Sequence, residues 1–511
     1  MSASPAFAAD ERKTVLWLGP PAPKPLLLGA CEQHGLRLRQ IDVDDIEELA
    51  PDARALVIPV VRADAAFIKR AKLAVRHCAR HGLRAVLVIS TDALPPNIPH
   101  KAEIDEYFKA YGRLQSSGLQ LSGLDYHWTD VAVELARHPV DAGENRGLTI
   151  VGVDLGDAEK ICLLRRAFHD YRELHLEALD GGKSGARTLR VTEGDVPKSA
   201  RPLVAKLSTP QKIDRERSGY GLIERGVPTR LYAPLVKERC LSAEQHAIAV
   251  YRFLEHCEPL TQRLETAGAL FVDHLFAQTL GDLHRPIGQS SALLHDLYGA
   301  QAGGLLRWTR DLDEAAAAAH RRGELVPGAV ELRALIAELP RVDFKSGTVH
   351  GDLHVGNLFV PDASNEAVII DYGSVRPGGP LLIDPACLEV SLAFTPAFLL
   401  PATPPACLTF RALLLDAYRY PLTPASTRHL SGAIGASRTS MIRKVRDIAR
   451  KLDDNPIGYA IAVAAQLVRF ASYNDTASVD DRSMAYELAA RLFSDTGVAM
   501  HQRRARQLGA P

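Results

Sequence analysis

Three side chains between positions 350 and 371 have the types and the spacing for chemistry on a magnesium-bound nucleotide. Residues 350–357 read His-Gly-Asp-Leu-His-Val-Gly-Asn, and Asp371-Tyr372-Gly373 follows an apolar run at 368–370. Phosphoryl transfer needs a carboxylate that orients the attacking hydroxyl and oxygen ligands that hold Mg²⁺. Asp352 suits the first task, and Asn357, five residues later, and Asp371 suit the second.

The same segment resembles the catalytic loop of the aminoglycoside phosphotransferase and choline kinase-like family. In this loop Gly351 stands where protein kinases have an arginine, and a second histidine follows at His354. The resemblance covers roughly residues 170–400. It implies ATP and Mg²⁺ as cofactors, with Asp352 acting on the acceptor hydroxyl and Asn357 and Asp371 binding the metal.

His350 and His354 are candidate catalytic residues beside Asp352, and their ordinary role would be to hold the shape of this loop. An alternative interpretation makes them zinc ligands at the i, i+4 spacing of a helix. Gly351 and Gly356 disfavour a helix there, and no glutamate follows the first histidine to act as a base.

Downstream, residues 378–386 read Gly-Gly-Pro-Leu-Leu-Ile-Asp-Pro-Ala and continue the resemblance. In the family, the second aspartate supports the catalytic loop from the start of a helix. Pro385 suits the first helical position and Asp384 the N-cap, so we expect a structural role for Asp384.

A nucleotide-binding lobe is expected upstream of the loop. Residues 174–179 and 187–192 are strand-like and flank a glycine-rich turn at 180–185. The candidates for cradling phosphates in this turn are Gly181, Gly182, Ser184 and Gly185. A Walker A motif would need glycine at position 177, which is Glu177.

Behind this hairpin, residues 202–207 read Pro-Leu-Val-Ala-Lys-Leu and predict a short strand. Its Val-Ala-Lys is similar to the kinase strand whose lysine contacts the nucleotide phosphates, which makes Lys206 the candidate lysine. The helical stretch 213–225 offers Glu216 or Glu224 to pair with Lys206, and Glu216 is preferred.

The resemblance implies an α+β two-lobed protein-kinase-like fold, with a β-rich N-lobe at 166–256 and a helical C-lobe at 257–511. Two further strands are expected at 232–236 and 247–254, leading into a connector at 253–258 whose backbone could bind adenine. Helices are expected for Asp157–Glu173, with Asp157 as N-cap, and for most of 264–319, 412–420, 441–452, 459–473 and 483–493.

Residues 1–165 are expected to form a separate α/β doubly wound module. Strand-like runs at 14–19, 36–41, 55–60 and 84–90 alternate with amphipathic stretches, and 148–153 is one more candidate strand near the end of the module. The module resembles a response-regulator receiver, but residues 19–21 and 59–61 lack the acids of a receiver. We interpret it as a degenerate module that contacts a protein partner.

The composition argues against other classes of protein. Lys plus Arg and Asp plus Glu number 61 each, so no overall basic charge points to nucleic acid. Seven cysteines without a C-x-x-C pair indicate reduced thiols and a cytoplasmic location. The N-terminus lacks a signal-peptide pattern, and prolines interrupt the apolar stretch 388–418, which favours a buried helical hairpin over a membrane span.

The expected function is transfer of the γ-phosphate of ATP to a hydroxyl of a small molecule or protein, in a bacterial signalling or stress context. One alternative is an ATP-binding regulatory scaffold that signals through residues 1–165 to a protein partner. A transfer of AMP in place of phosphate uses related lobes and is a third interpretation.

Overall fold

The computed structural model describes most of the chain from residue 144 onward and shorter pieces before it. The described ranges are 14–18, 25–42, 53–60, 73–74, 84–89, 120–122, 144–179, 186–194, 201–243, 245–292, 312–322, 324–339, 341–362, 364–394, 404–473 and 477–507. The chain divides into two compact units, one of Met1–Asp214 with Leu235–Phe253 and one of Arg215–Pro234 with Leu254–Pro511.

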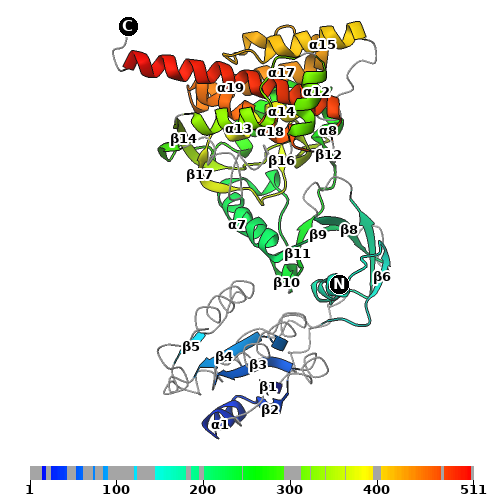
Figure 1. Ribbon diagram of the computed structural model, residues 1–511. Helices are drawn as coiled ribbons and strands as arrows, with labels where there is room; N and C mark the ends of the chain where they lie inside the picture. The colour runs from blue at the N-terminus through cyan, green and yellow to red at the C-terminus, as the bar shows by residue number, and fades with distance from the viewer. Residues whose placement is uncertain are drawn as a thin grey trace. The chain divides into compact units, whose positions relative to one another are not determined.

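The N-terminal part of the first unit contains a parallel sheet in the order β2-β1-β3-β4-β5 (Figure 1). Its strands are β1 (Thr14–Leu18), β2 (Arg37–Ile41), β3 (Ala53–Val60), β4 (Arg84–Ile89) and β5 (Gln120–Ser122), and helix α1 is Pro25–Gln33. Val15, Leu16 and Trp17 of β1 are all buried. Parallel sheets are covered on both faces, which explains the apolar runs of the inner strands β1, β3 and β4. The four strands expected here from the sequence are present.

A second sheet of six strands has the order β10-β11-β9-β8-β7-β6. Its strands are β6 (Thr149–Gly152), β7 (Glu173–Ala178), β8 (Arg187–Glu193), β9 (Leu203–Ser208), β10 (Leu241–Ser242) and β11 (Ala247–Arg252). All neighbouring pairs are antiparallel except β6 and β7, which are parallel. The predicted hairpin and lysine strand therefore form adjacent strands β7, β8 and β9.

Strand β6 corrects the expectation that residues 148–153 belong to the N-terminal module. It pairs with β7, and Leu148, Leu163 and Leu164 share one core with that sheet. Helix α6 (Ala158–Ala167) begins at its predicted N-cap, where the Asp157 carboxylate accepts from the N–H groups of Glu159 and Lys160. This core thus starts before the predicted boundary at residue 165.

Helix α6 is shorter than the predicted Asp157–Glu173, because the residues after it pair with β6 as strand β7. Thr149 donates from its backbone N–H to the carbonyl of Arg172 at 3.0 Å, and Glu173 opens β7. Asn145 fixes the connection by donating to the carbonyls of His169 and Tyr171.

The strand expected at 232–236 does not form. The 3₁₀ helices η4 (Thr229–Leu231) and η5 (Lys237–Arg239) flank this segment, which makes isolated bridges from Tyr232 to Ile369 and from Leu235 to Tyr251. Pro234 between them has no N–H to donate to a ladder.

The second unit contains two small sheets that carry the predicted catalytic residues. One is β12 (Cys257–Pro259), β15 (Leu358–Pro361) and β16 (Val368–Ile369), and the other is β13 (Gly288–Ala292), β14 (Val342–Val349) and β17 (Arg376–Pro380). Strand β13 lies within the stretch 264–319 that was expected to be mostly helical. Pro286 and Gly288 disfavour a helix there, and β13 pairs with β14 instead.

The other elements of the second unit within the described residues are helices, and α7 (Pro210–Gly226) starts in the first unit. They are α8 (Leu260–Arg263), α9 (Gly268–His274), the π-helix η6 (Leu275–Thr279), α12 (Asp313–Arg321), α13 (Ala329–Glu338), η8 (Val355–Asn357), α14 (Ile383–Phe394), α15 (Pro404–Ala417), η9 (Ala425–Thr427), α16 (Ser431–Ile434), α17 (Ala436–Leu452), α18 (Pro456–Ala471) and α19 (Val479–Gln507). Every residue of α14 is buried, and α14 packs against α17 and α18. Among the described residues no helix is long and apolar enough to cross a membrane.

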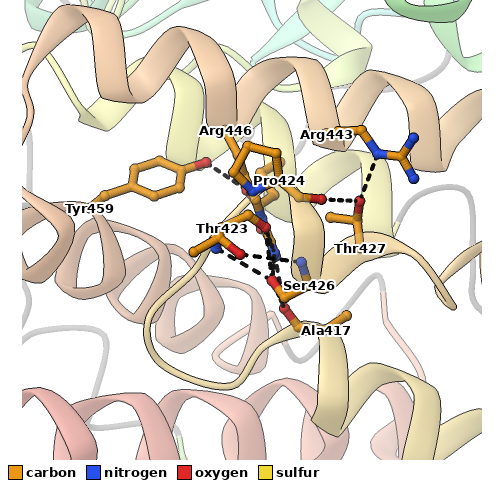
Figure 2. A network of polar contacts seen from close by, with 9 residues as sticks. Ala417, Thr423, Pro424, Ser426, Thr427, Arg443, Arg446 and Tyr459 are labelled. Carbon is orange, nitrogen blue, oxygen red and sulfur yellow. Dashed lines mark hydrogen bonds and ion pairs between the residues drawn. The ribbon is translucent and has the colours of Figure 1, made fainter.

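A buried polar network joins these helices (Figure 2). Glu389 of α14 and Arg446 of α17 form an ion pair at 2.7 Å, and both side chains are fully buried. Tyr459 of α18 donates to the same carboxylate at 2.5 Å. The remaining acceptors of the Arg446 guanidinium are the carbonyls of Ala417 and Thr423 and the hydroxyl of Ser426. A single cation thus ties three helices to the segment 417–426.

Candidate active site

Strand β14 leads directly into the loop His350–Asn357, and Asp384 of α14 holds the start of that loop. The two Asp384 carboxylate oxygens accept from the backbone N–H groups of His350 and Gly351, both at 2.7 Å. His284 adds a third bond to Asp384 at 2.8 Å. Helix α14 begins at Ile383, so Asp384 is not the expected N-cap, and its oxygens serve the loop instead of the helix.

Burial acts to raise the pKa of Asp384, but the hydrogen bond and charge of His284, with His350, outweigh it and lower that pKa. Asp384 is therefore an ionised carboxylate inside the protein, satisfied by three donors. Its expected structural role is confirmed.

Gly351 adopts a backbone conformation that disfavours side chains. Its φ is +77°, and a Cβ at this position would lie 2.6 Å from the carbonyl oxygen of Ser374. The turn after β14 therefore needs glycine, and the turn places Asp352 at the edge of the loop.

Asp352 forms an ion pair with Arg469 of α18, with 2.7 Å between Oδ1 and Nη1. Burial acts to raise the pKa of Asp352, but the charge of Arg469 and the lesser effects of His354 and His350 lower it far below its ordinary value. The pKa of Arg469 is raised well above its usual range, because the attraction of Asp352 outweighs burial. The carboxylate is thus charged throughout the neutral range.

The two histidines of the loop are engaged within it. His350 is fully buried, and its Nε2 lies 3.1 Å from the carbonyl oxygen of Ile370. His354 caps η8 by accepting from the N–H of Gly356 at 3.0 Å. Residues 350–354 are not helical, so the spacing that the zinc alternative needed is not present.

Asn357 is buried, and its amide nitrogen donates to the carbonyl of Asp352 at 2.9 Å. A carbonyl only accepts, so the Oδ1 of Asn357 is the atom that a cation would meet. The backbone N–H of Ile370 donates to the carbonyl of Asn357 at 3.0 Å, which joins the loop to the residue before Asp371.

Asp371 has a φ of +63°, a left-handed conformation that is uncommon outside glycine. Backbone strain of this kind concentrates at functional sites. An amide oxygen and a carboxylate are hard oxygen ligands of the kind that Mg²⁺ prefers. Asn357 and Asp371 therefore fit a magnesium ion.

Helix α7 supports the residues beside Asp371. The carboxylate of Glu216, which is buried, accepts from the N–H of Tyr372 at 3.1 Å. The Tyr372 hydroxyl accepts from the N–H of Ala233 at 2.8 Å and lies 3.0 Å from the carbonyl of the same residue. Glu224, the alternative acid, is exposed. Glu216 thus has a role beside Asp371 that the sequence did not indicate.

Lys206 lies in β9 opposite Thr188 of β8 and Ala249 of β11. Its neighbours Ala205 and Leu207 are buried in the core of the sheet, so Lys206 points to the other face. Thr188 stands near the start of β8, which places Lys206 at the end of the sheet where the glycine-rich turn joins β7 to β8. The turn residues Gly181, Gly182, Ser184 and Gly185 lie outside the described residues.

Lys206 and Glu216 belong to different compact units, so their pairing stays a prediction.

Three supporting residues were missed from the sequence. Arg469 pairs with Asp352, His284 bonds Asp384, and the Ser391 hydroxyl accepts from the N–H of Val355 at 3.1 Å. Of the three, only Arg469 could have been noticed in the sequence, because it is the one charged residue of the mostly apolar helix α18. However, a cation in the last turn of a helix is also expected from its favourable interaction with the helix dipole, so its position does not by itself indicate a role in the site.

Two family models match the chain. Residues 175–393 match the phosphotransferase enzyme family, and residues 326–473 match a family described as ternary complex associated domain 9. A search of curated proteins found no match. The first match confirms the predicted resemblance to phosphotransferases, and with it the transferase and kinase class of this part of the chain.

Solved structures of such enzymes are similar at low identity. An aminoglycoside phosphotransferase from Streptomyces rimosus is 15% identical, with 58% of this chain and 98% of that chain covered and a TM-score of 0.31. An ethanolamine kinase from Plasmodium vivax is 12% identical, with 75% and 95% covered and a TM-score of 0.35. A putative aminoglycoside phosphotransferase from Ralstonia eutropha is 14% identical, with 64% and 93% covered and a TM-score of 0.33.

Proposed function

We propose that this protein is an ATP- and Mg²⁺-dependent phosphotransferase that moves the γ-phosphate to a hydroxyl of a small molecule or protein. The observation that carries the proposal is the hydrogen-bonded loop that presents an ionised Asp352 and the buried Asn357, and that a backbone hydrogen bond from Ile370 joins to the segment of Asp371. The family match over residues 175–393 supports it.

Asp352 is assigned to the acceptor hydroxyl. The hydroxyl oxygen bonds to the γ-phosphorus, the bond to the bridging oxygen of ADP breaks, and the hydroxyl proton leaves through Asp352. Because the pKa of Asp352 is strongly lowered, the carboxylate is a weak base, and its main task is to orient the hydroxyl.

Asn357 and Asp371 are assigned to the metal, and Lys206 and the turn 180–185 to the nucleotide phosphates. A bound Mg²⁺ would supply neutralisation of the phosphate charge. Asp384, His284 and His350 hold the loop so that the separation of Asp352 and Asn357 stays constant.

The N-terminal module is proposed to contact a protein partner in a bacterial signalling or stress context. Its strand order β2-β1-β3-β4-β5 is the one that receivers share with flavodoxin, which supports a receiver-like identity. Strand β3 ends in Pro59 and Val60, where a receiver carries its phosphorylated aspartate. The module is thus assigned to binding and not to phosphate transfer.

The test uses ATP labelled separately at the γ- and α-positions, with Mg²⁺ and a cell extract split into small-molecule and protein fractions. We expect γ-label in one fraction with the wild type and little label with Asp352→Asn. The fraction that carries the label identifies the class of acceptor. Label from the α-position would mean transfer of AMP and would overturn the proposal.

A regulatory ATP-binding scaffold is the second candidate, because the ion pair with Arg469 engages the carboxylate that catalysis needs. This candidate predicts no transfer to either fraction, with ATP still bound. It also predicts that Lys206→Ala or Asp371→Ala abolishes the binding of a protein partner.

A further inference from the structure

The tail helix α18 supplies a cation to the proposed catalytic carboxylate. Arg469 contacts Asp352 at 2.7 Å, and the two side chains are only 20% and 19% exposed. Among the described residues, the largest charge effects on Asp352 come from Arg469, His354 and His350, and of these three Arg469 has a permanent charge. Residue 469 lies beyond the match to the phosphotransferase family, which ends at 393.

The N-terminal end of α18 is attached to β14, the strand that leads into the catalytic loop. Asn455 caps α18 by accepting from the N–H of Gly458, and its amide nitrogen donates to the carbonyl of Asp343 at 2.9 Å. Asp453, just before the cap, accepts from the N–H of Lys345 at 2.8 Å. Two hydrogen bonds therefore link the strand to the start of the helix.

The first turn and the C-terminal end of α18 contact α14, the helix that carries Asp384. Tyr459 bonds Glu389 in the buried network, and the rings of Phe470 and Phe394 pack with their centroids 5.0 Å apart. Arg469 lies beside Phe470, and its guanidinium is 6.0 Å from the ring centroid of Tyr473. The guanidinium is thus carried by a helix that contacts both the strand that leads into the loop and the helix whose Asp384 holds the loop.

We propose that Arg469 is a positioning residue for Asp352, and that α18 is therefore part of the active site and not an appended domain. The inference rests on the proposed function. Arg469 engages Oδ1 of Asp352, which assigns Oδ2 to the acceptor hydroxyl. The guanidinium is carried by a helix, so this contact limits the positions that the Asp352 carboxylate on its loop can take.

The first test is a double-mutant cycle on stability, which needs no acceptor. The variants Asp352→Asn, Arg469→Gln and the double variant are unfolded in urea and compared with wild type. We expect the two single shifts in midpoint to sum to more than the shift of the double variant, because each single variant leaves one buried charge without its partner. Additive shifts would show that the two charges are not coupled and would overturn the proposal.

The second test is the steady-state hydrolysis of Mg-ATP with water as acceptor. We expect Arg469→Gln to lower kcat by roughly 10- to 100-fold with the KM for ATP unchanged, since a misplaced catalytic group costs rate and not nucleotide binding. Arg469→Lys should restore part of the loss, and the double variant should be no slower than Asp352→Asn alone.

The matched control is Lys444→Gln, which removes a cation from helix α17. The Nζ of Lys444 lies 2.8 Å from Oδ1 of Asp273 in α9, and neither residue belongs to the loop. An equal loss of kcat in this control, or a loss in Arg469→Gln that appears in KM alone, contradicts the positioning role. A wild type that neither hydrolyses ATP nor transfers phosphate contradicts the proposed function itself. An active wild type with an additive cycle contradicts the role of Arg469 alone.

Discussion

Asp384 is the residue on which the geometry of the catalytic loop depends most directly. Each of its carboxylate oxygens accepts from a different backbone N–H of the loop, and His284 completes the set. A carboxylate is required, because an amide would present its NH₂ group to one of these N–H donors.

Replacing Asp384→Asn should therefore cost stability and activity together. We expect the free energy of unfolding to fall by about 1–3 kcal/mol, the cost of leaving a buried donor unsatisfied. Urea unfolding measures the first effect, and turnover with separately measured ATP affinity measures the second. His284→Gln, which keeps both loop bonds, should be milder. Equal losses of stability and turnover in the two variants would mean that Asp384 acts mainly through its bond with His284 and not through its bonds to the loop.

Asp481, at the start of α19, makes stability depend on pH. Burial raises its pKa to about 6, against the smaller opposing effect of the Ser478 hydrogen bond. The folded state holds this proton more tightly than the unfolded state, whose aspartate pKa is about 3.9. The contribution of Asp481 to stability is thus greatest below the unfolded pKa and is lost as pH rises through about 6.

The substitution Asp481→Asn should remove this dependence. We expect the variant to be more stable than wild type above about pH 6 and the difference to vanish toward about pH 4. Asparagine retains an oxygen for the Ser478 hydroxyl, which donates to Asp481 at 2.7 Å. Unfolding curves at several pH values measure the effect, and a difference that stays constant with pH would show that the pKa of Asp481 is not raised.

At the scale of elements, α7 approaches the segment of Asp371 so closely that only glycine fits at one position. A Cβ on Gly219 would lie 1.9 Å from the carbonyl oxygen of Tyr372, whereas a Cβ on Gly221 in the same helix would meet nothing within 4 Å. The helix interior otherwise favours alanine over glycine at both positions.

These two glycines form a matched pair for a test. Gly221→Ala should stabilise the protein by about 0.5–1 kcal/mol through helix propensity. Gly219→Ala should destabilise it by about 1–3 kcal/mol and lower turnover, because the overpacked segment must shift with Asp371. Thermal unfolding measures the stability of each variant, and ATP turnover measures its activity. A stabilising Gly219→Ala would show that α7 can move away without affecting the site.

For the helical unit as a whole, the Glu389–Arg446 pair couples α14, α17 and α18 (Figure 2). A buried ion pair often contributes little net stability, but the removal of one partner is expensive, because the other charge stays buried. In addition, Arg446 satisfies two backbone carbonyls of the segment 417–426.

Arg446→Met should therefore lower the free energy of unfolding by about 3–5 kcal/mol. Adding Glu389→Gln to this variant should recover part of the loss but not all, because the carbonyls of Ala417 and Thr423 remain without their donor. Urea unfolding of the three variants is the measurement. An unchanged free energy of unfolding in Arg446→Met would contradict the proposed coupling of the helices.

Local patterns were sufficient to predict the strands β7, β8 and β9 and the N-cap at Asp157. Each of these depends on residues close in sequence, where periodicity, capping and turn chemistry determine the backbone. The same reasoning failed at 232–236 and at β13. In both places, pairing with a distant segment decided the structure.

The sequence by itself determined which residue types could bind a nucleotide and a metal, and in what order along the chain. Only the tertiary structure decided that Arg469 contacts Asp352, that His284 bonds Asp384 and that Glu216 supports Tyr372. These contacts join residues far apart in the chain through buried charges and single hydrogen bonds. Such pairs leave no local periodicity, because their partners are selected by the packing of whole helices and strands and not by neighbouring residues.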